Sequence, residues 1–473
     1  MEDKLYHKLG IYKSLPQPLR NVIGYAYRTL PLSVRYGKTY KYYSNLLKYS
    51  PYWDDKKKEE YIFKHLKETL INAYENTLFY KNQFDSAGFD PYNFNELAQL
   101  QTIPLIDKLD LRKNKQEIKN RLIPEKDLLY VTTGGTTGIP VELYYVKGNE
   151  RSREFVFMTD QWKRIGYKTG DKIAVIRGSV VDEKGNKTLF KYEPVKNRLF
   201  LSTYDLYEKN FEKYVEKLHK FKPKFIHTYP SAVSVFAKYV KKNNIEFPTL
   251  KGIFCSSEQF FEGQRELIES AFKTKIYSWY GHSEYATLAG ECEVNTDYHL
   301  FFEYGYTELI DEEGKRITKP GVQGEIVGTS FEMKGFPIIR YKTGDFAEWV
   351  EGKCKCGRNY QLMRNVKGRW HQEMIVTKLD STISLTALNM HSDLFDHVVQ
   401  YQFYQKEKGK VELRIIKSDE YTIKDEEKIN NSFNLKFKEL VDFSISYVDQ
   451  LSRTERGKHR FLIQELDLKK ALS

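Results

Sequence analysis

Short apolar segments alternate with helical segments between residues 172 and 279, and this alternation limits the folds that the chain can adopt. The apolar segments, each expected to form a strand, are residues 172–177, 224–228, 252–255 and 275–279. Helices of about ten residues separate them, as in crossover units on a parallel sheet. Ligands of such α/β sheets bind where the strands end in loops. The residues that follow these strands are therefore the first candidates for a functional site.

The sequence pattern changes on both sides of this segment. Residues 300–350 alternate apolar and polar positions between turns, which predicts a β-rich subdomain. Residues 1–110 favour helices. We place a domain boundary near residue 368, because a unit of about 100 residues with its own mixed pattern follows it. In that unit we expect strands at 374–377, 397–404, 411–416 and 443–448 and helices near 385–394 and 424–440. The expected domains are thus 1–367 and 368–473.

The net charge, the N-terminus and the distribution of apolar residues indicate what kind of partner and which compartment to expect. The formal net charge is +12, from 76 basic and 64 acidic residues, and the sequence pI is about 9.0. Both signs are interspersed and no nucleic-acid-binding motif accompanies them, so we expect no nucleic-acid partner. The N-terminus lacks a signal-peptide core, and no window approaches the roughly 18 apolar residues of a membrane span. These features predict a cytoplasmic protein with reduced cysteines.

Residues 1–50 form a basic, aromatic N-terminal arm with few acidic residues. Pro16, Pro18 and Pro31 are expected to divide it into short helices. Three interpretations are open. The arm makes peripheral contact with a membrane surface, docks an acidic carrier protein, or only packs on the main domain.

Residues 130–140 form a loop composed mostly of Gly and Thr. In such a loop, backbone N–H groups and hydroxyls face a ligand with little side chain to keep a phosphate at a distance. A flexible hairpin turn is the alternative, since short motifs match by chance. The motifs that accompany the loop favour the phosphate site.

Four further motifs follow in order. They are Ser256-Ser257-Glu258, Tyr280-Gly281-His282-Ser283-Glu284, Tyr341-Lys342-Thr343-Gly344-Asp345 and Arg453-Thr454-Glu455-Arg456-Gly457-Lys458. With the glycine-rich loop, they resemble the signature motifs of adenylate-forming enzymes, the superfamily of acyl-CoA synthetases. The resemblance is closest to the phenylacetate-CoA ligase family and its capsular-polysaccharide-biosynthesis branch. The residues behind this narrower statement lie at 227–231, 280–293, 303–308 and 354–358.

The resemblance implies a large α/β adenylate-forming domain with parallel sheets, a small mobile C-terminal domain, and a set of site residues. Glu284 would hold Mg²⁺, Tyr280 would lie on adenine, and Asp345 would bind the ribose hydroxyls. Lys458 would stabilise charge on the carboxylate and α-phosphate, a purely electrostatic role. The remaining nucleotide-binding positions would be Thr132, Thr133, Gly134, Gly135, Thr136, Thr137, Gly138, Ser257, Glu258, Gly281, His282, Ser283 and Arg369.

The chain also departs from the family pattern. Gly134 and Ile139 stand in the phosphate loop where the family commonly has a hydroxyl residue and a lysine. The hinge motif carries Trp370-His371 after Arg369, and Ser452 replaces a proline before the last motif. The missing loop cation weakens the expectation of tight triphosphate binding, and the hinge residue stays open.

Three cysteines and one histidine form a separate group. Cys292 and His299 lie close together in sequence, as do Cys354 and Cys356. Three thiolates and an imidazole make a complete tetrahedral ligand set for structural zinc. Cysteine is also often a small buried apolar residue, which is the alternative.

The predicted function is therefore ATP-dependent activation of a carboxylic acid to an acyl-adenylate, with release of pyrophosphate. The acyl group would then pass to CoA, to a carrier-protein thiol or to a sugar amine, and the branch resemblance implies capsule or cell-surface polysaccharide biosynthesis. An ordinary aryl-CoA or acyl-CoA ligase is one alternative. A non-catalytic relative that binds a nucleotide or a partner is another, and a basic membrane or nucleic-acid binder is a third.

Overall fold

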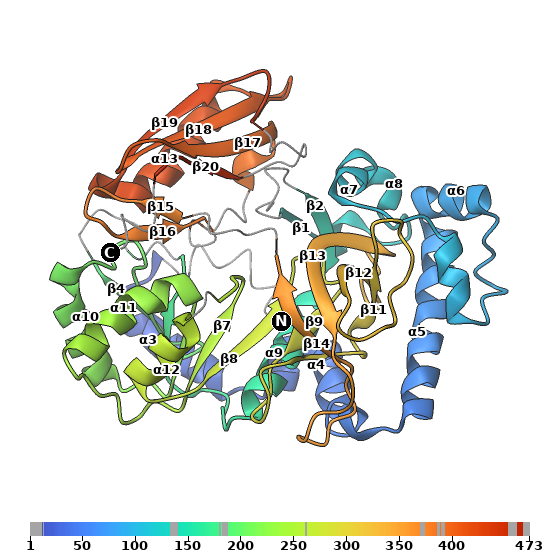
Figure 1. The fold of residues 1–473 in the computed structure, drawn as a ribbon, viewed down its shortest axis with the longest axis horizontal. Helices are drawn as coiled ribbons and strands as arrows, with labels where there is room; N and C mark the ends of the chain where they lie inside the picture. The colour runs from blue at the N-terminus through green and yellow to red at the C-terminus, as the bar shows by residue number, and fades with distance from the viewer. Residues whose placement is uncertain are drawn as a thin grey trace. The chain divides into compact units, whose positions relative to one another are not determined.

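The computed structural model describes residues 12, 14–132, 141–178, 181, 188–260, 263–368, 374–385, 388, 393–452 and 461–466. The chain forms two compact units, each assembled from separate stretches of sequence (Figure 1). The first unit contains Met1–Val131, Glu142–Thr169 and Tyr277–Arg369. The second contains Thr132–Val141, Gly170–Ile276 and Trp370–Ser473.

Helices dominate the first part of the first unit, as the sequence predicts. They are α3 (Gln17–Thr29), α4 (Leu32–Leu46), η2 (Ser50–Tyr52), α5 (Asp55–Asn76), α6 (Leu78–Ala87), η3 (Leu97–Thr102), α7 (Lys108–Lys113), α8 (Lys115–Ile118), η4 (Glu125–Asp127) and α9 (Glu150–Lys163). Pro16 and Pro31 occupy the N-cap positions of α3 and α4. Among the helices that the structure describes, none is both long enough and apolar enough to span a bilayer.

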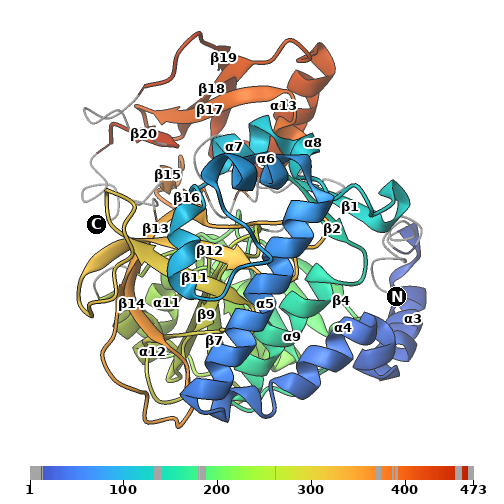
Figure 2. The ribbon, with the colours of Figure 1, turned by 90° about the vertical axis from the view of Figure 1, so that its right-hand side faces the viewer.

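Helix α5 shows how sequence periodicity positions a helix here. Its N-cap residue Asp54 accepts a hydrogen bond from the backbone of Lys57 at 2.8 Å, which satisfies one of the free N–H groups of the first turn. Leu66, Leu70 and Ala73 share one face and are fully buried. That face packs beside β11, and Figure 2 shows the helix running along this side of the unit.

The strands of the first unit form an antiparallel sheet. The strands are β8 (Ile276–Gly281), β9 (Leu288–Gly290), β10 (Tyr298–Leu300), β11 (Gly305–Ile310), β12 (Gln323–Ser330), β13 (Tyr341–Trp349) and β14 (Leu362–Lys367). Their order is β11-β12-β13-β14-β10-β9-β8. A separate ribbon pairs β1 (Leu128–Thr132) with β2 (Glu142–Val146). The β-rich pattern predicted for residues 300–350 is present in β11, β12 and β13.

The second unit contains three of the four strands predicted for the parallel sheet, and the fourth, predicted at 275–279, is β8 of the first unit. Strands β3 (Ile173–Ile176), β5 (Arg198–Leu201), β6 (Phe225–Thr228) and β7 (Gly252–Ser256) run parallel in the order β7-β6-β3-β5, and β4 (Phe190–Glu193) joins the β5 edge antiparallel. The connecting helices are α10 (Glu208–Phe221), α11 (Pro230–Lys242) and α12 (Gln264–Phe272). Their apolar faces are buried against the sheet in one core. The β4-β5 hairpin is the part of this sheet that the sequence analysis missed.

A second, smaller sheet in this unit is formed by the C-terminal residues. Strands β17 (Val398–Gln405), β18 (Lys410–Lys417), β19 (Asp442–Tyr447) and β20 (Leu462–Gln464) have the order β19-β18-β17-β20, and α13 (Ile423–Phe437) packs on them. Strands β15 (Met374–Val376) and β16 (Thr382–Ser384) form a ribbon, and η5 (Asp393–Phe395) and η6 (Lys438–Leu440) are single turns. These elements match the predicted α+β pattern, except that the helix expected at 385–394 lies largely outside the described residues.

Candidate active site and metal-ligand cluster

Glu284, the predicted magnesium ligand, follows strand β8 and is only 4% exposed. One carboxylate oxygen accepts the hydroxyl of Tyr341 at 2.9 Å, and the other lies 3.2 Å from Nδ1 of His282. Burial acts to raise the pKa of this carboxyl, but the His282 hydrogen bond, the charge of Lys108 and the Tyr341 hydroxyl outweigh it and hold the pKa well below its ordinary value. Glu284 therefore keeps its negative charge in a buried position.

The surroundings of Glu284 fit a magnesium ion beside a polyphosphate. Mg²⁺ is usually held by one or two carboxylates together with substrate phosphates and water, and Glu284 supplies an ionised carboxylate. Nε2 of His282 is buried and has no hydrogen-bond partner among the residues that the structure describes. A buried polar atom of this kind is uncommon unless a ligand or water satisfies it. The carboxylate of Glu284 and Nε2 of His282, both next to β8, are thus suited to bind a charged ligand.

Two residues that the sequence analysis did not single out hold the loop that carries Glu284. Tyr145 donates its hydroxyl to the carbonyl of Ser283 at 2.5 Å. The buried guanidinium of Arg153 donates to the carbonyls of Tyr304 at 3.1 Å and Tyr285 at 3.4 Å. Tyr285 has a φ of 52°, a strained conformation for a bulky residue. No local sequence signal marks Arg153 or Tyr145, because their partners lie more than a hundred residues away.

Tyr280 and Asp345 contact each other directly. The Tyr280 hydroxyl donates to Oδ2 of Asp345 at 2.9 Å, which joins the end of β8 to the middle of β13. Burial, and next the charge of Asp345, raise the pKa of Tyr280 well above its ordinary range, so the phenol stays protonated as a donor. Thr343 orients the aspartate by accepting a bond from its backbone N–H at 3.1 Å. The structure thus brings together two residues predicted to bind the nucleoside.

Gly281 ends strand β8 and lies close to the neighbouring strand. A Cβ atom at this position would stand 2.7 Å from the Leu288 side chain, so the position favours a residue without a side chain. Thr132 is the last residue of β1 and is buried. Thr133, Gly134, Gly135, Thr136, Thr137, Gly138, Arg369 and Lys458 lie outside the described residues, and their predicted roles stay predictions.

Ser257 and Glu258 follow β7 in the second unit. Ser257 accepts a hydrogen bond from Arg177 at 3.1 Å. Glu258 accepts from the backbone and hydroxyl of Ser231, both at 2.9 Å, and from the hydroxyl of Ser384 at 2.5 Å. Burial raises the pKa of Glu258 despite these bonds. The carboxylate therefore links the start of α11 to β16, a structural contact that the sequence analysis did not predict. Its proposed part in nucleotide binding stays a prediction.

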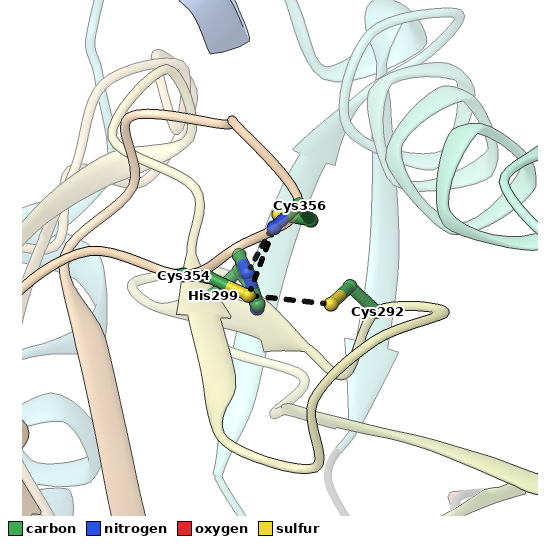
Figure 3. A group of neighbouring side chains, drawn as sticks. All are labelled: Cys292, His299, Cys354 and Cys356. Atoms are coloured by element: carbon green, nitrogen blue, oxygen red, sulfur yellow. Dashed lines mark hydrogen bonds between the residues drawn. The ribbon is translucent and has the colours of Figure 1, made fainter.

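Cys292, His299, Cys354 and Cys356 form a compact cluster in the first unit (Figure 3). Their four ligand atoms all lie within 4.8 Å of one another. Sγ of Cys292 lies 3.7 Å from Sγ of Cys354, and Sγ of Cys356 lies 3.3 Å from Nε2 of His299. A tetrahedron with zinc–sulfur bonds of about 2.3 Å has edges of about 3.8 Å, so the spacing of this group suits a zinc ion.

The atoms around the cluster also suit a metal. Nδ1 of His299 lies 3.1 Å from the carbonyl of Asp297; because a carbonyl only accepts, Nδ1 carries the hydrogen and Nε2 presents its lone pair. Burial lowers the pKa of His299 to about 4, which keeps the ring neutral. Backbone N–H groups of Val294 and Asn295 donate to the sulfur of Cys292 at 3.3 and 3.2 Å. Hydrogen bonds of this kind orient the ligands of a metal ion and support them in place.

The chain is similar in sequence to a CapK protein and to phenylacetate-coenzyme A ligases. A family model described as the CapK C-terminal domain matches residues 375–465. Protein CapK of Staphylococcus aureus is 25% identical over 391 residues, which cover 78% of this chain and 81% of that protein. The phenylacetate-coenzyme A ligase of Escherichia coli K12 is 26% identical over 319 residues, which cover 66% of this chain and 71% of the relative.

A solved structure shares the fold. It is 2-hydroxyisobutyryl-CoA ligase in complex with 2-HIB-AMP and CoA in the thioesterification state, which matches with a TM-score of 0.57 and 18% identity, over 89% of this chain and 93% of that chain. These comparisons confirm the resemblance to the phenylacetate-CoA ligases and to the capsule branch, and they confirm the fold class. The sequence relatives also confirm the predicted class of enzyme, an adenylate-forming ligase.

Proposed function

We propose that this enzyme activates a carboxylic acid with Mg-ATP to an acyl-adenylate, releases pyrophosphate, and passes the acyl group to a thiol or an amine. The observation that carries the proposal is the buried, ionised Glu284 beside the Tyr280–Asp345 pair. Each of these residues stands at the position that the family motifs assign to magnesium, adenine or ribose. The relatives named above support the same reaction class.

The proposed reaction requires charge screening and alignment. A carboxylate oxygen attacks the α-phosphorus of ATP, a new P–O bond forms, and the bond to the bridging oxygen breaks as pyrophosphate leaves with the electron pair. Bound Mg²⁺ would neutralise charge on the phosphates. Glu284 would hold that ion, and the Tyr280–Asp345 pair would fix the nucleoside so that the attacking oxygen stays in line. In the second step the thiol or amine attacks the acyl carbon, loses its proton, and AMP leaves.

The acyl acceptor and the biological setting are finer proposals. The similarity to a protein named CapK supports a role in capsule or cell-surface polysaccharide biosynthesis. In that setting a carrier-protein thiol or a sugar amine is the expected acceptor. The similarity to phenylacetate-coenzyme A ligases supports CoA as the alternative acceptor.

A screen of carboxylic acids by ATP-dependent pyrophosphate release, with and without CoA, tests the proposed reaction. One or more acids should give magnesium-dependent release. If the protein binds ATP but no acid produces pyrophosphate above background, it is a nucleotide-binding relative without catalysis.

Lys458→Ala should reduce the rate of adenylation by about 10²–10³-fold, the usual cost of removing one group that stabilises charge in the transition state. Nucleotide affinity should remain close to that of the wild type. Single-turnover adenylation and equilibrium ATP binding separate the two effects. Lys470→Ala, which removes a charge from the same tail, is the control. Adenylation by Lys458→Ala at wild-type speed would show that the last motif is misassigned.

We expect acyl transfer to CoA to be slow compared with transfer to the native acceptor. The reason is the likeness to the capsule branch, in which an ordinary CoA ligase would have no evident place. The measurement compares thioester or amide formation with CoA, candidate carrier proteins and amino sugars, after adenylation has been shown with the same acid. Rapid, saturable formation of the CoA thioester would contradict this expectation and show that the protein is an ordinary acyl-CoA ligase.

A further inference from the structure

Helix α3 of the N-terminal arm turns its apolar side to solvent. Leu19, Val22 and Ile23 are 51%, 68% and 45% exposed, and Ala26 is also exposed. Their spacing places all four on one stripe of the helix about 100° wide. Leu30, the C-cap residue, is 38% exposed. In a helix that merely covers a globular domain, this stripe would face the core. Here the apolar stripe is left open.

The opposite side of α3 faces the rest of the first unit. Gly24 is the buried residue of α3. The guanidinium of Arg35 on α4 lies 4.7 Å from the ring of Tyr27 on α3. Helix α4 is in turn fixed on α9, because Tyr36 stacks on Phe155 with ring centroids 4.1 Å apart. Figure 2 shows α3 continuing from α4 at this side of the unit. The contacts of α4 therefore set the direction of the open stripe.

The charged residues of the arm from residue 4 onward are all of one sign. The sequence from residue 4 to residue 53 contains nine Lys or Arg residues and no Asp or Glu. Lys38, Lys41 and Lys48 on or next to α4 are exposed. Tyr25 and Tyr49 are each 63% exposed. An apolar helical stripe on an arm rich in cations and exposed tyrosines is the composition of a helix that lies in a bilayer interface.

We propose that α3 binds the surface of an anionic lipid bilayer, with its apolar stripe among the acyl chains and the lysines at the head groups. A second copy of this chain is a poor occupant, since the two basic arms would repel each other. Anionic lipid supplies both the apolar depth and the opposite charge. The proposal concerns where the enzyme works and does not depend on the reaction proposed above.

Co-sedimentation of the full chain with vesicles tests this proposal. We expect binding to vesicles of phosphatidylcholine mixed with phosphatidylglycerol and at least tenfold weaker binding to phosphatidylcholine alone. Binding should weaken further as salt shortens the screening length from about 10 Å at 0.1 M to about 3 Å at 1 M. The double variant Val22→Asp, Ile23→Asp should lose at least tenfold in binding, because it places two charges in the apolar stripe. Lys38→Gln with Lys41→Gln should lose severalfold only on the anionic vesicles.

Leu122→Asp is the matched control, since Leu122 is 73% exposed in the same unit but far from the arm in sequence. It should bind vesicles as the wild type does. Unchanged thermal unfolding of the Val22→Asp, Ile23→Asp variant would show that the loss is not a folding defect. Equal binding of this variant and the wild type, or no binding of the wild type to anionic vesicles, would overturn the proposal. So would a wild-type dimer that becomes a monomer in the variant, because a second copy would then cover the stripe.

Discussion

Cys354→Ser should remove zinc from the purified protein and lower its free energy of unfolding by about 4 kcal/mol or more, since loss of a structural metal is among the largest single-residue effects. The reason lies in the cluster itself. Cys292 and Cys354 are buried with their sulfurs 3.7 Å apart, and burial raises the pKa of Cys292 to about 12. A bound zinc ion would favour the thiolate forms that burial disfavours, so the binding free energy of the metal would become part of the free energy of folding. Metal analysis and thermal unfolding measure both effects.

Cys255→Ser is the matched control for this prediction. Cys255 is also fully buried, but it lies on β7 and outside the cluster, so this variant should keep about one zinc per chain. The loss of Cys354 should affect stability far more than ATP affinity. The prediction is wrong if freshly purified wild-type protein contains no zinc, folds normally and is insensitive to chelators. The cysteines of the cluster would then be buried apolar residues that bind no metal.

The parallel sheet could be predicted because its strands are continuous apolar runs. Strands β3, β6 and β7 are buried at every position, as expected where helices cover both faces. The β4-β5 hairpin escaped prediction for the opposite reason. Strand β4 is half-buried throughout, and its turn depends on Asn197 with a φ of 54°. Nothing in a polar, alternating segment of four residues distinguishes such a hairpin from a loop.

The motif residues of the site could be named from sequence, whereas the residues that tune them could not. Glu284, Tyr280 and Asp345 stand in ordered motifs. The charge of Lys108 lowers the pKa of Glu284 only because the fold brings the two residues close together. The hydroxyl of Ser384 donates to Glu258, which lies 126 residues away in the sequence. The four cluster residues were found because cysteine and histidine are chemically distinctive. What joins them is the pairing of β10 with β14, in which His299 lies opposite Leu362.

Glu284→Gln should reduce pyrophosphate release by about 10²-fold or more, because it removes the negative charge that would hold Mg²⁺ against the phosphates. Glutamine keeps the size of the side chain and an oxygen that can accept from Tyr341. The loss should therefore appear in the magnesium dependence of the rate, measured by titrating Mg²⁺ at saturating ATP. Tyr341→Phe is the matched comparison: it keeps the charge and loses one hydrogen bond, so about a tenfold loss is expected.

The pH dependence separates a metal-binding role of Glu284 from a structural one. The folded pKa of Glu284 lies below its unfolded value, so its contribution to stability is present above the unfolded pKa and is lost as the pH falls through the acid range. Between about pH 5 and 8 the wild type should show no loss of magnesium affinity from protonation of this carboxyl. Tyr341→Phe removes one of the bonds that lower the pKa, so its magnesium affinity should begin to fall at a higher pH than in the wild type. If Glu284→Gln keeps wild-type magnesium dependence and loses only thermal stability, the carboxylate stabilises the fold through its hydrogen bonds with His282 and Tyr341 and binds no metal.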